Sequence, residues 1–301
     1  MIASLLISTR NRAGSLRQCL DAIKKIDCAF QWELIIIDNG STDGTPAMLS
    51  DFAACSCLNV RYLREPKRGQ ARALNRGIAI ASGKILIFTD DDCYVAPDFL
   101  QRMHDAMEAR ALDYAVGRVE LFDPADAALT IKTDLEPYDI APNTALKLGS
   151  VHGCNMAVRR TVIEKIGLFD TLLGVGAWLR SGADHDLLQR ASIAGLSGGY
   201  VPGAIVYHAH GRRGAAVTRV MERYDVGRGA ILAKLFLQAP HFSSQVLESE
   251  HHPFRTIYWL FRNDFWLAWR MSAGFVGYLI ANMFRNCADE IKRRPRPVLN
   301  K

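Results

Sequence analysis

Apolar, β-rich runs alternate with segments of helical periodicity as far as residue 90, and this alternation restricts the possible folds more than any other feature. The runs cover residues 3–8, 33–37, 59–63 and 84–89, and the helical segments between them cover residues 14–26, 43–53 and 69–81. Such alternation builds βαβ units with right-handed crossovers. It predicts an α/β fold, with a mostly parallel, Rossmann-like sheet and flanking helices.

The alternation ends near residue 110. Beyond it we expect strands over residues 114–121 and 199–207, a loop-rich insertion over 124–150, a helix over 184–195 and mainly helical structure over 216–237. The chain has 301 residues, of which 49% are hydrophobic, so it can bury a full core.

Polar residues directly after the strands mark the expected binding site, because open sheets of this kind bind ligands outside the carboxyl ends of their strands. The first run ends in Ser8, Thr9 and Arg10, which offer hydroxyl and guanidinium donors. The second ends in Asp38, at the same edge of the predicted sheet. Both groups are placed where a nucleotide would lie.

Three adjacent carboxylates, Asp90, Asp91 and Asp92, follow the fourth run. Ionised carboxylates repel one another, so their grouping is costly unless a positive charge lies among them. Mg²⁺ and Mn²⁺ take one or two protein carboxylates and complete their shells with water and phosphate oxygens. The alternative is that one Asp caps a helix beginning near Pro97 and the others are solvated. The triplet alone leaves both interpretations open.

Basic residues gather before the third helical segment, where Lys67, Arg68 and Arg72 flank Gly69. A helix amino terminus with cationic side chains favours a diphosphate. A solvated basic loop and helix face is the alternative.

The segment "GVGAWLRSGADHDLLQRAS" places a glycine-rich loop before a helix. Asp184 shares the helical periodicity of Leu187, Leu188 and Ala191, so it belongs to the buried face. Asp186 points elsewhere and can pair with Arg190 at i+4. Asp184 is therefore a candidate general base, and helix capping is its alternative role.

Six segments resemble, in order, the motifs of glycosyltransferase family 2, which has the GT-A fold. They are "LLISTRNR", "ELIIIDNGSTDGT", "GQARALNRGI", "LIFTDDDCYVAPDFL", "GCNMAVRR…IGLFD" and "GADHDLLQRA". The resemblance implies an inverting enzyme that transfers a sugar from a nucleoside diphosphate to a hydroxyl of a glycan, a lipid-linked or another acceptor, with Mn²⁺ or Mg²⁺ as cofactor. UDP is the expected nucleotide, and GDP and dTDP stay open.

The resemblance also implies roles for particular residues. Thr9 and Asp38 would contact the nucleotide base, Arg10 the donor, and Arg72 the base or the phosphates. Asp90 and Asp91 would contact the donor, Asp92 and His208 the metal ion, and Asp184 would be the catalytic base. The family often has Glu-Asp where this chain has Ala183-Asp184, which puts in doubt any acceptor contact of the missing Glu.

The acceptor is expected to bind among the irregular segments. Trp178 could stack on a sugar ring, although simple packing under a loop explains it as well. Asn155, in "GCNMAVRR", is a second candidate. The segment from Asp134 to Tyr138 lies in the long insertion, which could form a flap.

We expect a catalytic domain over residues 1–225, with a nucleotide-binding half over 1–110 and an acceptor-binding half over 111–225. A helical extension over 226–301 would follow. In it, Tyr258, Phe261, Phe265 and Trp269 have helical spacing, and the longest uncharged run, residues 271–284, is shorter than the roughly 20 residues that span a bilayer.

Two interpretations of the extension stay open. It could lie on an anionic membrane surface, with Lys292, Arg293, Arg294 and Arg296 assisting, or pack on the catalytic domain or at a homo-oligomer contact.

Composition bears on location and partners. Basic and acidic residues balance over residues 1–254, so the net charge of +6 gives no footprint for nucleic acid. The seven cysteines are odd in number and form no C-x-x-C pair, so neither a disulfide framework nor a zinc site is suggested. The amino-terminal run lacks the basic region and cleavage site of a signal peptide. We therefore expect a cytoplasmic protein, peripheral on the inner membrane face if the extension binds there.

Two other functions compete with glycosyl transfer. A sugar nucleotidyltransferase would need a glycine-rich phosphate loop after the first strand, where this chain has only Gly14. A non-catalytic scaffold that binds nucleotide or glycan would not need both the aspartate triplet and Asp184.

Overall fold

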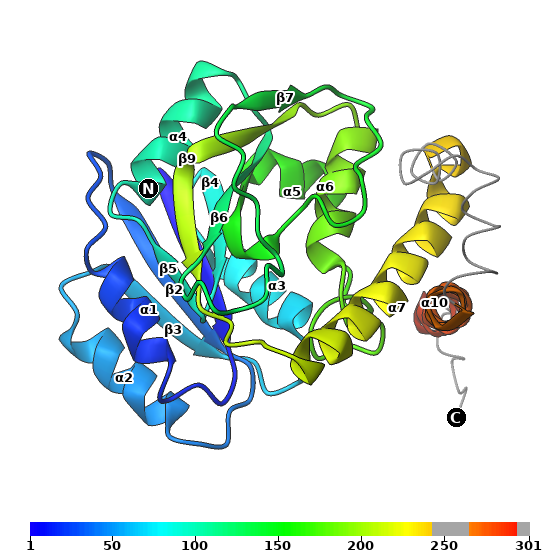
Figure 1. The fold of residues 1–301 in the computed structure, drawn as a ribbon, viewed down its shortest axis with the longest axis horizontal. Coiled ribbons are helices and arrows are strands. Elements are labelled where there is room, and N and C mark those ends of the chain that lie inside the picture. The colour runs from blue at the N-terminus through cyan, green and yellow to red at the C-terminus, as the bar shows by residue number, and fades with distance from the viewer. Residues whose placement is uncertain (243–264, 294–301) are drawn as a thin grey trace, which may run out of the picture.

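A nine-stranded sheet forms the centre of the computed structural model, which describes residues 1–242 and 265–293 (Figure 1). Its first four strands are parallel and follow the order β3-β2-β1-β4. They are β1 (Ala3–Thr9), β2 (Trp32–Asp38), β3 (Val60–Arg64) and β4 (Ile85–Asp90). The predicted α/β fold and its four parallel strands are confirmed, with strand bounds that differ by at most one residue.

The second half of the sheet is mixed. Beyond β4 the order is β8-β6-β9-β5, with β7 paired to β9. These strands are β5 (Cys93–Val95), β6 (Tyr114–Leu121), β7 (Tyr138–Ile140), β8 (Met156–Arg159) and β9 (Gly198–His208). Strand β8 is antiparallel to both β4 and β6, whereas β6 and β9 are parallel. The strands predicted over 114–121 and 199–207 are confirmed, but β5, β7 and β8 are too short to leave a periodic signal.

Helices cover both faces of the sheet. One face carries α1 (Leu16–Ile23), α2 (Thr45–Cys55) and α4 (Phe99–Ala109), and the other carries α3 (Gln70–Ile80), α5 (Arg160–Ile166) and α6 (Ala183–Ile193). Leu5 and Leu6 are neighbours in β1 and both are fully buried, but each packs into the core on a different face of the sheet. A strand covered on both faces needs apolar residues at successive positions, which explains the unbroken runs in the sequence.

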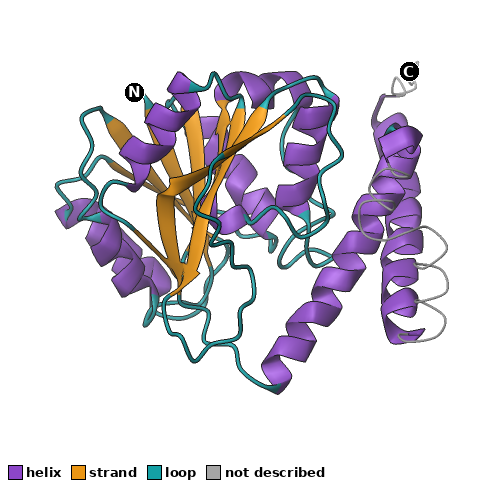
Figure 2. Cartoon of the chain, turned by 45° about the horizontal axis from the view of Figure 1, so that its top comes forward, coloured by secondary structure: helices purple, strands orange, loops and turns teal. Residues whose placement is uncertain are grey.

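Two long helices form the carboxy-terminal part: α7 (Ala215–Gln238) and α10 (Phe265–Arg293), which lie side by side (Figure 2). Glycines permit their close approach. A Cβ on Gly229 would lie 1.9 Å from the Met271 carbonyl oxygen, and one on Gly274 equally close to the Val226 carbonyl oxygen. Helix α7 runs across residue 225, so the domain boundary proposed there stays a prediction. Tyr258 and Phe261 lie outside the described residues. Among the described helices, none is long and apolar enough to span a membrane.

A buried ionic cluster holds these helices against the part of the chain that contains the sheet. The Asp170 carboxylate binds Lys234 Nζ of α7 at 2.9 Å and Arg285 Nη1 of α10 at 2.7 Å. Lys234 Nζ also lies 2.7 Å from the Asp186 carboxylate of α6, and the Tyr278 hydroxyl donates to Asp170. Burial alone would raise the pKa of Asp170, but the charge and hydrogen bond of Lys234 lower it to about 2. The described part of the extension therefore packs on the part of the chain that contains the sheet.

We expect Asp170→Asn to lower the free energy of unfolding by about 3–5 kcal/mol at neutral pH, because it leaves buried positive charge without its partner. Since the folded pKa of Asp170 is depressed, this stabilisation is present above its unfolded pKa and is lost as pH falls toward about 2. Chemical denaturation at pH 7 and pH 3 tests both points. A difference between wild type and variant that does not shrink at pH 3 would show that the charge of Asp170 is not responsible.

Candidate active site

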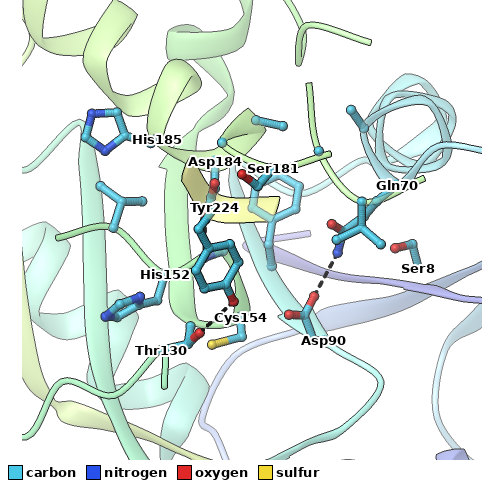
Figure 3. A pocket seen from close by; sticks show the side chains of 18 of the residues that line it. Ser8, Gln70, Asp90, Thr130, His152, Cys154, Ser181, Asp184, His185 and Tyr224 are labelled. Carbon is cyan, nitrogen blue, oxygen red and sulfur yellow. Dashed lines mark hydrogen bonds between the residues drawn. The ribbon is translucent and has the colours of Figure 1, made fainter. Parts of the chain in front are cut away.

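One cavity of about 630 Å³ opens at the carboxyl ends of the parallel strands. Its lining includes Thr9, the three residues Asp90, Asp91 and Asp92, and also Asp184 and His208. Figure 3 shows Asp184 and Asp90 among the side chains that surround this hollow. The aspartate triplet and the candidate base therefore face one shared space.

Strand register explains how distant residues meet here. Ser8 of β1 pairs with Asp90 of β4, and Thr9 pairs with Asp38 of β2. Residues aligned across parallel strands lie side by side, so the strand ends deliver hydroxyl and carboxyl groups to one edge of the sheet.

Each aspartate of the triplet has a different partner. The Gln70 amide donates to Asp90 Oδ1 at 2.9 Å, and the Thr9 hydroxyl donates to Asp91 Oδ2 at 2.6 Å. Asp92 lies between two cationic or ionisable groups, with Arg12 Nη2 at 3.3 Å and His208 Nε2 at 3.4 Å. None caps α4, whose N-cap is Asp98, so the capping alternative does not apply.

Burial and mutual repulsion perturb the triplet. Burial, followed by the charge of Asp92, raises the pKa of Asp90 to about 7. Burial also raises the pKa of Asp91 to about 6, although Arg12 opposes it. The hydrogen bond from His208 lowers the pKa of Asp92 despite burial. Arg12 offsets only part of the negative charge of these crowded carboxylates, and their oxygen atoms suit a hard divalent cation. The residues present therefore fit Mn²⁺ or Mg²⁺.

Asp184 lies in the first turn of α6 and accepts a hydrogen bond from the Gly153 backbone N–H at 2.8 Å. Burial raises the pKa of its carboxyl group, and backbone N–H groups of His185 and Gly153 partly oppose this. A carboxylate made more basic by burial suits proton abstraction. Asp186, two residues on, pairs with Arg190 at 3.0 Å as predicted. The prediction that Asp184 is on the buried face and Asp186 is not was wrong, because Asp186 is buried and Asp184, which faces the cavity, is half-buried.

The glycine-rich loop closes on the amino end of α3. The Gln70 N–H donates to the Val175 carbonyl at 2.8 Å, and Gly174 and Gly176 line the cavity. From the basic segment, Arg68 and Gln70 line the cavity, whereas Arg72 lies outside the lining. Helix α3 begins at Gln70. Arg72 is two residues further along this helix, so its side chain leaves the helix on a different side from that of Gln70.

Arg10 and Asp38 border the site differently. Arg10 lines the cavity and donates to the Asn39 carbonyl at 2.8 Å. Asp38 is fully buried beside the lining, accepts from the Ser41 N–H at 2.8 Å and lies 3.3 Å from Arg64 Nε. Its proposed contact with a base stays a prediction.

Both acceptor candidates lie outside the cavity lining. Asn155 is fully buried, and its amide donates to the carbonyls of Arg118 and Ala204, which join β6 and β9. Trp178 is 61% exposed and lies near Gly277 of α10. Their surroundings explain Asn155 as a connector between strands and Trp178 as a surface contact, and their role in acceptor binding stays a prediction.

Several lining residues carry no signal in the sequence. Tyr224 of α7 reaches into the cavity and shares a hydrogen bond with Thr130 of the long insertion at 3.1 Å (Figure 3). His152 lines the cavity too, and burial lowers its pKa to about 4. His185 is buried beside Asp184. The insertion thus forms part of the wall, which no local pattern could reveal.

A family model described as "Glycosyl transferase family 2" matches residues 4–167, more than half of the chain. The sequence is also similar to glycosyltransferase AglE of Haloferax volcanii, with 28% identity over 234 residues, covering 76% of this chain and 72% of that protein.

Two solved structures resemble the fold. Staphylococcus aureus TarS 1–349, in complex with UDP-GlcNAc, superposes with a TM-score of 0.64 and 17% identity, covering 88% of this chain and 76% of that chain. Mannosyltransferase PcManGT of Pyrobaculum calidifontis, in complex with GDP-Man and Mn²⁺, superposes with a TM-score of 0.63 and 21% identity, covering 97% of this chain and 81% of that chain.

Proposed function

Because the chain belongs to glycosyltransferase family 2 and has the GT-A fold, we propose that it transfers a sugar from a nucleoside diphosphate to an acceptor hydroxyl with inversion at the anomeric carbon. In this proposal Asp184 is the general base, and a divalent cation binds at Asp92 with His208. The observation that carries it is the single cavity that Asp184 shares with the aspartate triplet. Family membership also favours an enzyme over a non-catalytic scaffold.

The donor would bind along the strand ends. Thr9 and Asp38 would hold the base, as the family resemblance implies. When bound, Mn²⁺ or Mg²⁺ would stabilise the negative charge that develops on the departing diphosphate. Arg68 and Arg212 line the same cavity and form no ion pair with a carboxylate of the described residues. Their guanidinium groups are thus available to the diphosphate oxygens, where they would strengthen binding in the transition state.

Asp184 would accept the proton of the acceptor hydroxyl as that oxygen attacks the anomeric carbon. The Gly153 N–H fixes the carboxylate in position, and burial keeps it basic. Attack from the side opposite the diphosphate inverts the anomeric configuration. Tyr224, Thr130 and His152 line the cavity and would help to exclude water.

The nucleotide of the donor is not fixed by the fold alone. TarS was solved with UDP-GlcNAc and PcManGT with GDP-Man, so both nucleotides occur with this fold. We propose UDP on the family resemblance, with a glycan or lipid-linked hydroxyl as acceptor.

We expect a nucleoside diphosphate to stabilise the protein only when Mn²⁺ or Mg²⁺ is present, because the crowded carboxylates repel a bare diphosphate. At a concentration of about 100 Kd the melting temperature would rise by about 5 °C or more. Thermal unfolding with UDP, GDP and dTDP, each with Mn²⁺ or with a chelator, tests this. No shift with any of the three, or an equal shift in chelator, would contradict the proposed donor site.

We further propose that α10 lies on an anionic membrane surface. Trp269, Val276, Ile280 and Met283 share one face of this helix and are 42–61% exposed. That apolar face precedes the basic run at residues 292–296. An apolar stripe beside basic residues is typical of helices that lie in the membrane interface.

We expect the protein to float with vesicles of anionic phospholipid at low salt, and not with neutral ones. Ile280→Asp places a charge on the exposed stripe and should abolish flotation without unfolding the protein. Leu135→Asp, at an exposed apolar residue in the insertion, is the control and should float normally. If the Ile280→Asp variant floats as wild type does, the exposed apolar face of α10 does not bind the membrane.

A further inference from the structure

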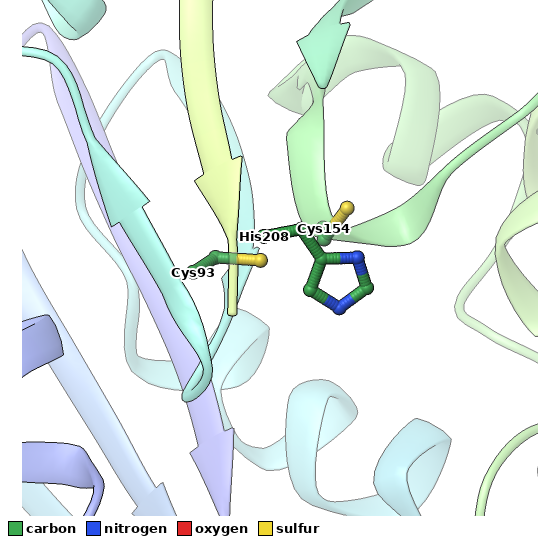
Figure 4. Close-up of side chains that lie close together, drawn as sticks. All are labelled: Cys93, Cys154 and His208. Atoms are coloured by element: carbon green, nitrogen blue, oxygen red, sulfur yellow. The ribbon is translucent and has the colours of Figure 1, made fainter. Parts of the chain in front are cut away.

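Two thiols and an imidazole meet at the wall of the cavity. Sγ of Cys93 in β5, Sγ of Cys154 in η1 (Gly153–Asn155) and a ring nitrogen of His208 in β9 all lie within 4.8 Å of one another (Figure 4). Strand pairing sets Cys93 directly opposite His208. All three residues are buried, with exposed fractions of 0%, 1% and 3%.

This donor set differs in kind from the neighbouring carboxylates. Thiolate and imidazole favour Zn²⁺ and other thiophilic ions, whereas carboxylate oxygens favour Mg²⁺ and Mn²⁺. Bond lengths of about 2.3 Å to sulfur and about 2.0–2.1 Å to nitrogen put the ligand atoms of a tetrahedral ion about 3.3–3.8 Å apart. The three atoms observed here need to approach by only about 1 Å. We propose that Cys93, Cys154 and His208 form a site for a thiophilic divalent cation such as Zn²⁺.

His208 is arranged as metal-binding histidines usually are. Its Nε2 lies 3.4 Å from Asp92 Oδ1, while its Nδ1 is buried and has no hydrogen-bond partner among the described residues. A histidine that binds a metal commonly donates its other ring N–H to a carboxylate, which fixes the ring. Nδ1 is thus the nitrogen left for the ion, with Asp92 orienting the ring. Cys154 and His208 line the cavity, which supplies a route of entry and room for a water ligand.

Sequence spacing cannot find this site, because its ligands come from β5, η1 and β9. Zinc motifs recognised in sequences have two of their ligands only a few residues apart. Here the three ligands are far apart along the chain and are joined only by the mixed half of the sheet.

Occupation of the site would regulate the enzyme. The thiols lose their protons to solvent when the ion binds, so the ligands carry two negative charges that offset its charge. With Nδ1 bound to the ion and the Nε2–H directed at Asp92, His208 can no longer serve as a ligand to a second divalent cation there. Thiophilic ions should therefore inhibit transfer, and higher Mg²⁺ should weaken the inhibition. This effect rests on the proposed function, whereas ion binding does not.

Cobalt binding tests the site without any activity assay. We expect Co²⁺ to produce thiolate-to-cobalt charge-transfer absorption at one ion per chain, in protein whose Cys55, Cys57 and Cys287 are replaced by Ser. Zn²⁺ should displace the cobalt and remove the band. Cys93→Ala and Cys154→Ala should each lose it, whereas Cys19→Ala, at a buried cysteine outside the cluster, should keep it. Thermal unfolding confirms that each variant is folded. If only one of the Cys93 and Cys154 variants folds, its spectrum alone is enough to test the site.

Absence of the band in folded wild-type protein, or its persistence in a folded Cys93 or Cys154 variant, would overturn the site. Inhibition is then measured separately. Zn²⁺ should inhibit wild type at least about tenfold more strongly than Cys154→Ala. A cobalt band without inhibition would overturn the regulatory role alone, and loss of transfer activity altogether would leave the spectroscopic result intact.

Discussion

Asp184→Asn is expected to lower the rate of sugar transfer by about 10²- to 10⁴-fold, the usual loss when a general base is removed. The amide is nearly isosteric and can still accept the Gly153 N–H, so the fold and the cavity should survive. Donor binding should be unchanged, because the nucleotide and the metal ion bind on the side of the triplet. Steady-state rates together with calorimetric titration of nucleoside diphosphate test both expectations.

Asp186→Asn is the matched control, because it lies on the same helix and changes a carboxylate that contacts Arg190 and Lys234 rather than the cavity. We expect it to lower thermal stability while transfer by the folded protein stays within about twofold of wild type.

The wild-type rate should rise with pH through the Asp184 pKa, which burial raises above the usual value, because only the ionised form accepts a proton. A transfer rate in Asp184→Asn within twofold of wild type would refute its role as base.

Asp92→Asn should reduce transfer by about 10³-fold or more and weaken Mn²⁺ binding. A bound metal ion supplies several kcal/mol of transition-state stabilisation, and each 1.36 kcal/mol corresponds to a factor of ten in rate. The change also removes the carboxylate beside His208 Nε2 and one of the two carboxylates beside Arg12. Paramagnetic resonance of free Mn²⁺ measures binding directly, and the rate is measured over a range of Mn²⁺ concentrations.

Asp98→Asn serves as control for Asp92, since Asp98 is half-buried, pairs with Arg102 and lies outside the cavity lining. It should leave both Mn²⁺ affinity and rate unchanged. If Asp92→Asn binds Mn²⁺ with wild-type affinity and retains its activity, the metal site must be built from other residues.

The parallel half of the fold could be predicted from the sequence because its signals are local. A strand buried on both faces must be apolar throughout, and its carboxyl end must turn polar where it reaches the ligand edge. This pattern predicts Thr9, Asp90 and Asp92 as site residues, and all three line the cavity. Helical periodicity also points to Asp184, which lines the cavity, but the structure leaves this residue half-buried and buries Asp186 instead.

The mixed half could not be predicted, because its signals are tertiary. Strands β7 and β8 have three and four residues and are defined by their pairing with β9 and β4. Tyr224 belongs to a helix whose register in the cavity depends on how α7 packs. Arg68 rather than Arg72 lines the site because the loop at Gly176 closes against it, with a Gly176 Cβ position only 3.1 Å from Arg68 Cγ.

The anomeric configuration of the first product formed tests most directly whether Asp184 acts as a base. Loss of activity in Asp184→Asn fits a base and a nucleophile alike, but only a base lets the acceptor attack the anomeric carbon in one step. Proton NMR of the product, recorded during the first turnovers with a donor of defined anomeric configuration, distinguishes them. We expect the opposite anomer from that of the donor. A product that retains the donor configuration would contradict the single displacement and the role given to Asp184.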